Sequence, residues 1–287
     1  MLLKQYSTKA FVFILCFLFT LPMVAQALTS QQMGLVINLA GKQRMLTQKM
    51  SKEAFFIAKG VSVDANKTSL TKTAALFDKT LKGLIKGDPE LKLPQANNPE
   101  IIAQLNKVST LWAEFNQSIQ AVAGGNTSSE VLNKIAAQNI PLLKNMNKAV
   151  QMFAKSSGSK LDAGMAKTIN LAGKQRMLTQ KMTKELLMVA NNIDADNAKK
   201  SLNGTVILFE KTLTGLVKGD PTLGLPGTKN ADIIAQLGVV SKIWADYKPV
   251  LSAVDTSDAG LKKAEELNMP LLKNMNKAVK MFEKSIK

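Results

Sequence analysis

The chain has 287 residues and a formal net charge of +17, because 38 lysines and arginines face 21 acidic residues. Hydrophobic residues make up 46% of it and aromatic residues only 5%, a composition that predicts a folded protein with an aliphatic core and disfavours an all-β structure. Histidine is absent and Cys16 is the one cysteine, which removes the commonest general base and the usual transition-metal ligands. We therefore expect no enzyme activity, no metal site and no cofactor.

The first 27 residues have the pattern of a secretory signal peptide. Lys4 and Lys9 precede a continuous apolar run over 11–21, and the stretch ends in Ala25-Gln26-Ala27, a small-x-small cleavage pattern. We expect a mature protein that starts near Leu28 and is periplasmic or secreted. The alternative is that the segment stays in place as an N-terminal membrane anchor.

The remainder of the chain is a tandem repeat. The run from Ile37 to Met50, with the sequence INLAGKQRMLTQKM, recurs without change from Ile169 to Met182. A second run, PLLKNMNKAV, occurs at 141–150 and again at 270–279. Repetition of this kind indicates two copies of one structural unit, and we place them at 28–157 and 160–287.

Each copy has the apolar periodicity of four helices. In the first copy we predict helices at about 31–59, 65–86, 99–123 and 128–156, separated by loops at Gly87-Asp88-Pro89 and around 124–126. Short connections between successive helices favour an up-down-up-down bundle. The sequence thus predicts an all-α protein of two tandem four-helix bundles after a signal peptide. Its linker around 156–159 is compatible with bundles that lie side by side or end to end.

The repeated helix has two distinct faces. Leu35, Leu39, Leu46 and Met50 fall on one stripe that suits the core of the helix's own bundle. A second arc holds a glycine in mid-helix, which costs about 1 kcal/mol of helix stability relative to alanine, and the neighbouring polar side chains surround the gap it leaves. The members of this arc in the first copy are Ile37, Asn38, Gly41, Arg44, Met45 and Gln48.

The arginines are the most specific feature of this arc. Arg44 and Arg176 are the only two arginines in the chain, beside 36 lysines. A planar guanidinium can hold a planar oxyanion through two parallel hydrogen bonds, which a lysine cannot reproduce. The competing interpretation is a structural arginine that pairs with a carboxylate such as Glu53, or with one on a facing bundle.

The motif resembles that of a known group of sensors. The run Ile-Asn-x-Ala-Gly-x-x-Arg-Met-x-x-Gln is similar to the ligand box in the periplasmic domains of NarX-type nitrate/nitrite histidine kinases. The fuller Ala-Gly-Lys-Gln-Arg-Met-Leu-Thr-Gln-Lys-Met resembles the N-terminal domain of type IV pilus methyl-accepting chemotaxis transducers, the PilJ type. The resemblance implies a four-helix bundle. It also implies that the first helices of two such domains meet at a twofold axis, where two box arginines close on one anion.

These observations lead to a functional hypothesis with one alternative. We expect an exported, non-catalytic binding protein that holds a small oxyanion such as nitrate or nitrite between the first helices of its two repeats. Unlike the sensors, the sequence continues into no signalling module after the repeats, so we expect a membrane sensor, chemoreceptor or transporter to read the bound state. Nucleic acid is not an expected partner, since no aromatic residues alternate with the lysines, whereas self-association is compatible with the motif. The candidate ligand-binding residues are Asn38, Gly41, Arg44, Met45, Gln48, Asn170, Gly173, Arg176, Met177 and Gln180.

The alternative is a structural or adaptor module of an envelope chemosensory or pilus-related system. In that case the glycine face would be a close-packing seam between helices, and no small-molecule ligand would exist.

Overall fold

The computed structural model describes residues 28–156 and 162–286, so the predicted signal peptide lies outside the described residues. Within these ranges the regular structure is helical. No described helix is both long enough and apolar enough to cross a membrane. The helices are α1 (Ser30–Ala58), α2 (Val63–Lys86), α3 (Pro99–Ala123), α4 (Ser129–Ser156), α5 (Ala163–Ala190), α6 (Ala195–Lys218), α7 (Ala231–Ser252) and α8 (Asp258–Lys284).

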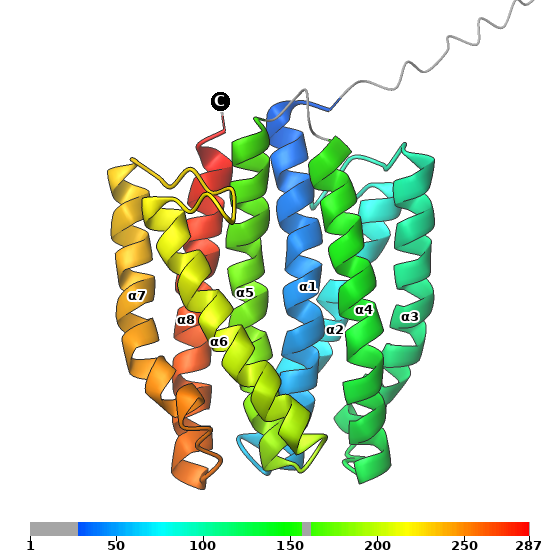
Figure 1. Ribbon diagram of the computed structural model, residues 1–287. Coiled ribbons are helices and arrows are strands. Elements are labelled where there is room, and N and C mark those ends of the chain that lie inside the picture. Colours follow the sequence, from blue (N-terminus) through cyan, green and yellow to red (C-terminus); the bar gives the residue numbers. More distant parts are fainter. Residues whose placement is uncertain (1–27, 157–161, 287) are drawn as a thin grey trace, which may run out of the picture.

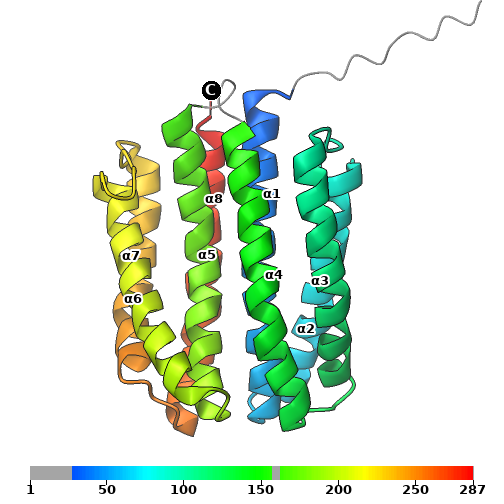
Figure 2. The ribbon, with the colours of Figure 1, turned by 45° about the vertical axis from the view of Figure 1, so that its right-hand side comes forward.

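The two bundles stand side by side. Helices α1–α4 form one bundle and α5–α8 the other, with α1 and α5 adjacent and parallel in the middle of the molecule (Figures 1 and 2). The prediction of two tandem four-helix bundles is confirmed, and the arrangement that the sequence left open is the lateral one. The two copies of the repeated motif consequently face each other.

The helix ends follow local chemistry. Thr29 caps α1 through a reciprocal pair of hydrogen bonds with Gln32, and the Asn98 side chain caps α3 just before Pro99. Gly87 ends α2 with a φ of 82°, and a Cβ there would lie 3.0 Å from the backbone nitrogen of Gln95. The predicted loop at Gly87-Asp88-Pro89 is therefore confirmed. Glycine suits this turn because it tolerates the positive φ and leaves room for the neighbouring backbone.

Proline does not end the fourth helix of either bundle. Pro141 lies inside α4 and Pro270 lies inside α8, and each helix continues through it. A proline within a helical segment predicts either a kink or the true start of the helix, and the continuous helices exclude the second outcome. The side chain of Asn145 donates to the Pro141 carbonyl at 2.9 Å.

The central helices are buried on nearly every side, since each packs against its own bundle and against the other first helix. Leu46 and Met50 belong to the core as predicted, whereas Leu35 and Leu39 are only half-buried. The contact between α1 and α5 also buries charged side chains. Arg44 is 1% exposed and Lys52 is 4% exposed.

Candidate functional site

The two arginines meet at the contact between α1 and α5. Arg44 donates from Nη2 to the backbone carbonyl of Asn170 at 3.1 Å, and Arg176 donates from Nη2 to the carbonyl of Asn38 at 3.1 Å. Each arginine therefore reaches across to the opposite bundle. The geometry is reciprocal, as expected from two copies of one motif related by an approximate twofold axis.

The two glycines make room for the guanidinium groups. A Cβ on Gly41 would lie 3.3 Å from Arg44 Nη2 and 3.7 Å from Arg176 Nη2. On Gly173 the corresponding distances are 3.4 Å to Arg176 Nη2 and 3.7 Å to Arg44 Nη2. Both Nη2 atoms thus lie against both glycines, which explains why glycine is kept in the middle of two helices despite its cost in helix stability.

No carboxylate forms an ion pair with either arginine among the described residues. Both Nε atoms are buried without a hydrogen-bond partner in that part of the chain. Burial and the nearby charge of Arg176 lower the pKa of Arg44 to about 9, and burial lowers the pKa of Arg176 to about 10 against the opposing effect of Glu283. Two buried like charges held close together favour an anion between or beside them.

The asparagines of the motif contribute mainly through their backbone. The carbonyls of Asn38 and Asn170 accept from the opposite arginine, while the Asn38 side chain donates to Glu283. The Oδ1 atoms of both asparagines are buried without a partner in the described structure. The sequence predicts both asparagines as ligand-binding residues, and in the structure their backbone carbonyls, not their side chains, contact the arginines.

The glutamines and methionines of the motif are buried next to the arginines along the same two helices. Gln48 donates to Asn139 at 2.8 Å, and Gln180 donates to Asn268 at 2.9 Å, each within its own bundle. Met45 and Met177 are both 6% exposed. The arrangement therefore brings together Asn38, Gly41, Arg44, Asn170, Gly173 and Arg176 and places the other four candidates around them.

Two residues at the site are not among those that the sequence predicts. Asn147 accepts from Arg44 Nη1 at 2.7 Å, and Asn276 accepts from Arg176 Nη1 at 2.8 Å. A signal for them exists, because both asparagines lie within the identical run PLLKNMNKAV. On its own, that run indicates only the repeat.

A second layer of polar contacts lies along the same two helices. Lys52 donates to Asn268 at 2.8 Å, and Lys184 donates to Asn139 at 3.3 Å, so each lysine crosses to the last helix of the other bundle. Burial lowers the pKa of both lysines to about 8. These crossed contacts connect the bundles at a second level beyond the arginine pair.

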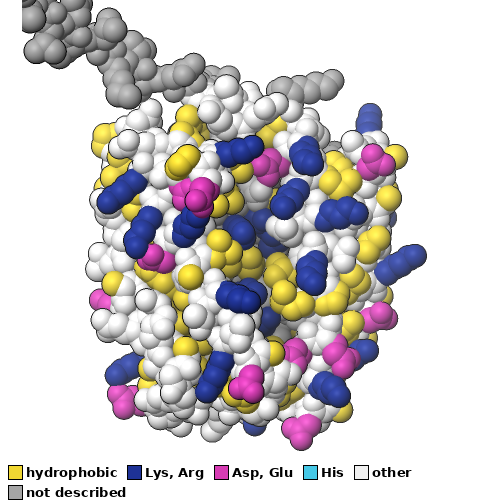
Figure 3. Space-filling view, turned by 180° about the vertical axis from the view of Figure 1, so that it is seen from behind, with side chains coloured by type: hydrophobic (Ala, Val, Ile, Leu, Met, Phe, Trp, Pro, Cys, Tyr) yellow, Lys and Arg dark blue, Asp and Glu magenta, His cyan; other side chains and the backbone are white. Residues whose placement is uncertain are grey.

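Lysines also surround the arginine pair nearer the surface. Lys42 and Lys174 are half-buried, and after burial itself the charges of Arg176 and Arg44, respectively, contribute most to lowering their pKa values. Figure 3 shows the molecule from behind, where basic side chains gather around a central hollow. The surroundings of the site therefore attract anions.

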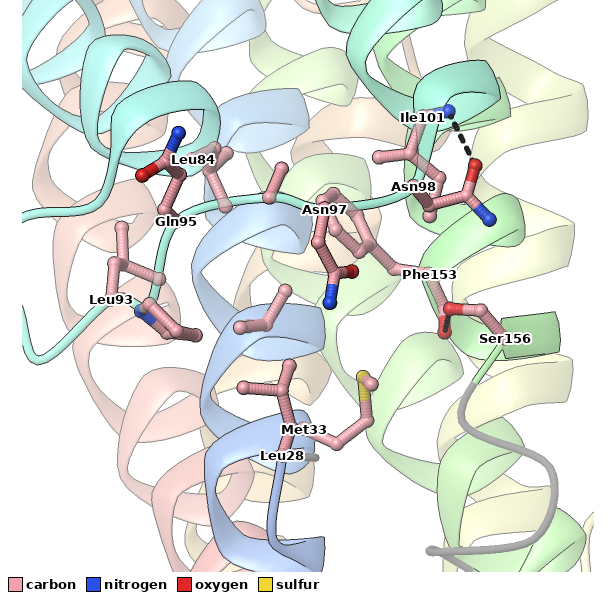
Figure 4. Close-up of a pocket in the computed structure, with 13 residues that line it drawn as sticks. Leu28, Met33, Leu84, Leu93, Gln95, Asn97, Asn98, Ile101, Phe153 and Ser156 are labelled. Carbon is pink, nitrogen blue, oxygen red and sulfur yellow. Dashed lines mark hydrogen bonds between the residues drawn. The ribbon is translucent and has the colours of Figure 1, made fainter. Parts of the chain in front are cut away.

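A separate cavity of about 270 Å³ lies at one end of the first bundle (Figure 4). Met33 of α1, Phe153 of α4 and the loop that carries Asn97 and Asn98 line it, together with other apolar and amide side chains. None of the lining residues is charged, and none belongs to the repeated motif. This cavity does not suit an anion.

The chain belongs to the family described as type IV pili methyl-accepting chemotaxis transducer N-terminal domain, PilJ, whose sequence pattern matches it twice, at 27–137 and 160–268. A methyl-accepting chemotaxis protein McpN from Pseudomonas aeruginosa is 31% identical over 43% of this chain and 22% of that protein. A putative methyl-accepting chemotaxis protein AlkN from Alcanivorax borkumensis is 25% identical over 74% of this chain and 29% of that protein. The chain thus spans under a third of the length of these curated relatives.

Proposed function

We propose that this tandem member of the PilJ family is a periplasmic, non-catalytic sensor protein that binds one small planar oxyanion, of the nitrate or nitrite type, between Arg44 and Arg176. The observation that carries the proposal is a pair of fully buried guanidinium groups with no carboxylate partner in the described structure. Buried charges of one sign are costly unless they are paired. A small anion supplies that pairing.

The side-by-side arrangement supports this proposal. In the nitrate sensors that the motif resembles, two subunits supply one arginine each, whereas here two bundles of one chain bring both arginines together. The anion would accept hydrogen bonds from the guanidinium groups and replace the contacts to Asn147 and Asn276 or to the opposite carbonyls. Because those contacts link α1, α4, α5 and α8, replacing them would change how the bundles fit together.

The relatives indicate what reads this change. Both curated relatives are chemotaxis proteins by their names, and we infer that a membrane chemosensory component is the partner of this chain. The half-buried lysines Lys42 and Lys174 would assist capture of the anion from solution.

Isothermal titration calorimetry of the purified protein tests the proposal. We expect saturable binding of nitrate or nitrite, with chloride, sulfate and phosphate at matched ionic strength giving weaker heats. The double variant Arg44→Ala, Arg176→Ala should lose the binding. Equal small effects for every salt, unchanged in the double variant, would show that anions only screen the basic surface.

The adaptor alternative rests on the reciprocal arginine contacts. The hydrogen bonds from each arginine to the opposite backbone carbonyl connect the two bundles directly. If no anion binds and the double variant loses stability or its contact with a chemosensory partner, the motif is a structural seam.

A further inference from the structure

A groove of about 770 Å³ opens between α4, α5 and α6, on the face opposite to the hollow of Figure 3. Apolar side chains of Ile140, Leu143 and Met188 line part of it. Ile140 is 63% exposed, which is unusual for a large apolar residue that faces a hollow. The groove also has five lysines and two acidic residues, namely Lys144, Lys174, Lys181, Lys184, Lys200, Glu185 and Asp194.

The internal repeat shows what fills the equivalent place on the other face. There Glu265 of α8 accepts from Ser62 at 2.8 Å and from Asn66 at 2.9 Å, which ties α8 to the start of α2. Its charge favours the protonated form of buried Lys52. The ring of Phe56 lies 5.9 Å from the same ammonium group. A carboxylate and an apolar group thus accompany this lysine.

The groove face lacks the carboxylate and the aromatic ring. Ala136 of α4 occupies the position equivalent to Glu265, and Met188 occupies that of Phe56. Lys184, the counterpart of Lys52, is 6% exposed and lies 3.3 Å from Asn139 Oδ1. The neighbouring Glu185 is held by Lys181. A buried lysine therefore lies at the groove without the second carboxylate that its counterpart has.

We propose that the groove binds an organic monocarboxylate with an apolar chain. The carboxylate lies toward Lys184 and Lys200, where Thr68 stands in the first copy, and the chain packs on Ile140, Leu143 and Met188. The ligand supplies the carboxylate that Glu265 supplies on the other face, and its chain fills the space beside Met188, which is smaller than Phe56. The volume is that of an ordinary small-molecule site.

The two acidic residues of the groove do not prevent a carboxylate from binding there. Asp194 is exposed and accepts from Asn197 at 2.8 Å, and Glu185 is neutralised by Lys181. With five lysines against two acidic residues, the groove keeps a net positive charge. A carboxylate bound near Lys184 is attracted by this excess, whereas a cationic amphiphile of the same length is repelled.

Calorimetric titration with butyrate, hexanoate and octanoate, below their micellar concentrations, tests the proposal. Each added CH₂ group should strengthen binding by about fourfold, since burial of one CH₂ is worth about 0.8 kcal/mol. Hexylamine should not bind. The same affinity for all three acids, or no binding by any of them, would overturn the proposal.

The decisive variant is Ala136→Glu, which gives the groove face the residue of the opposite face. It should weaken octanoate binding at least tenfold and raise the melting temperature. Ala137→Glu is the matched control, because it adds the same charge one residue further, at an exposed position where the second copy has Glu266. Octanoate binding to that control should be unchanged.

A second variant tests the groove even if Ala136→Glu disturbs the fold. Lys184→Met removes the charge at the groove and should also weaken octanoate binding at least tenfold. Nitrate binding should persist in both groove variants. A failure of the groove proposal can therefore be distinguished from a failure of the proposed nitrate site. Wild-type octanoate affinity in either variant, or competition between octanoate and nitrate for one site, would refute the proposal.

Discussion

Arg44 donates to the backbone carbonyl of Asn170, 126 residues further along the chain, at 3.1 Å. The contact is made by the second copy of the same motif, so one polypeptide builds internally a contact of the kind that two subunits build in a homodimer. The arginine site is therefore a property of the tandem arrangement, and neither bundle holds it alone.

For nitrate affinity, the planar set of donors on each guanidinium group should matter more than its positive charge. Arg44→Lys keeps the positive charge but removes the parallel donors, and we expect at least a tenfold loss of nitrate affinity. Arg176→Lys is the twofold-related variant and should lose a similar factor. Full affinity in both lysine variants, measured by calorimetry, would mean that charge alone binds the anion.

Glycine at the motif should be required for the space that it leaves. A Cβ on Gly41 would lie 3.3 Å from Arg44 Nη2, so Gly41→Ala should displace the guanidinium and weaken nitrate binding. Gly204→Ala in α6 is the control, because a Cβ at that position would meet no neighbouring atom within 4 Å. That control should raise the free energy of unfolding by about 0.5–1 kcal/mol without changing affinity. Equal affinities for the two variants would argue against a packed site.

The crossed lysines make stability depend on pH. Burial lowers the pKa of Lys52 and Lys184 from the ordinary value of 10.5 to about 8. Between pH 8 and 10 the unfolded chain therefore binds more protons than the folded one, and the free energy of unfolding rises with pH. Denaturant melts across this range should show that rise, and the double variant Lys52→Met, Lys184→Met should have a flatter profile. A profile of the same slope in that variant would assign the effect to other groups.

The asparagines that accept from these lysines should stabilise the contact between bundles. Asn139→Ala leaves Lys184 and Gln48 without this acceptor, and we expect a loss of about 1–3 kcal/mol in the free energy of unfolding. Asn268→Ala should cost a similar amount, since it is the equivalent residue. Asn106→Ala, at an exposed position of α3, serves as the control and should leave stability nearly unchanged.

Much of the fold could be predicted because the relevant signals are local. The helix predicted at 99–123 has the observed bounds, and those predicted at 31–59, 65–86 and 128–156 differ from the observed ones by one or two residues at one or both ends. Caps, Gly-Asp-Pro turns and apolar periodicity define these ends. The approach of Arg44 to Arg176 was implied by the resemblance to the nitrate sensors, given a lateral arrangement.

The rest depends on packing between distant segments. The linker at 156–159 allowed two arrangements, and the choice between them follows from the burial of α1 against α5. Periodicity assigns Leu35 and Leu39 to the core, but a helix buried on almost all sides has no single apolar stripe. Asn147 contacts Arg44 only because α4 returns beside α1, which spacing within α1 cannot reveal.

Calorimetric titration of nitrate into the wild-type chain and into the Arg44→Ala, Arg176→Ala double variant is the sharpest test of the arginine site. We expect one nitrate to bind per chain, with weaker binding in either single arginine variant and none in the double variant. Nitrate binding of unchanged affinity in the double variant would contradict an anion site between the two arginines.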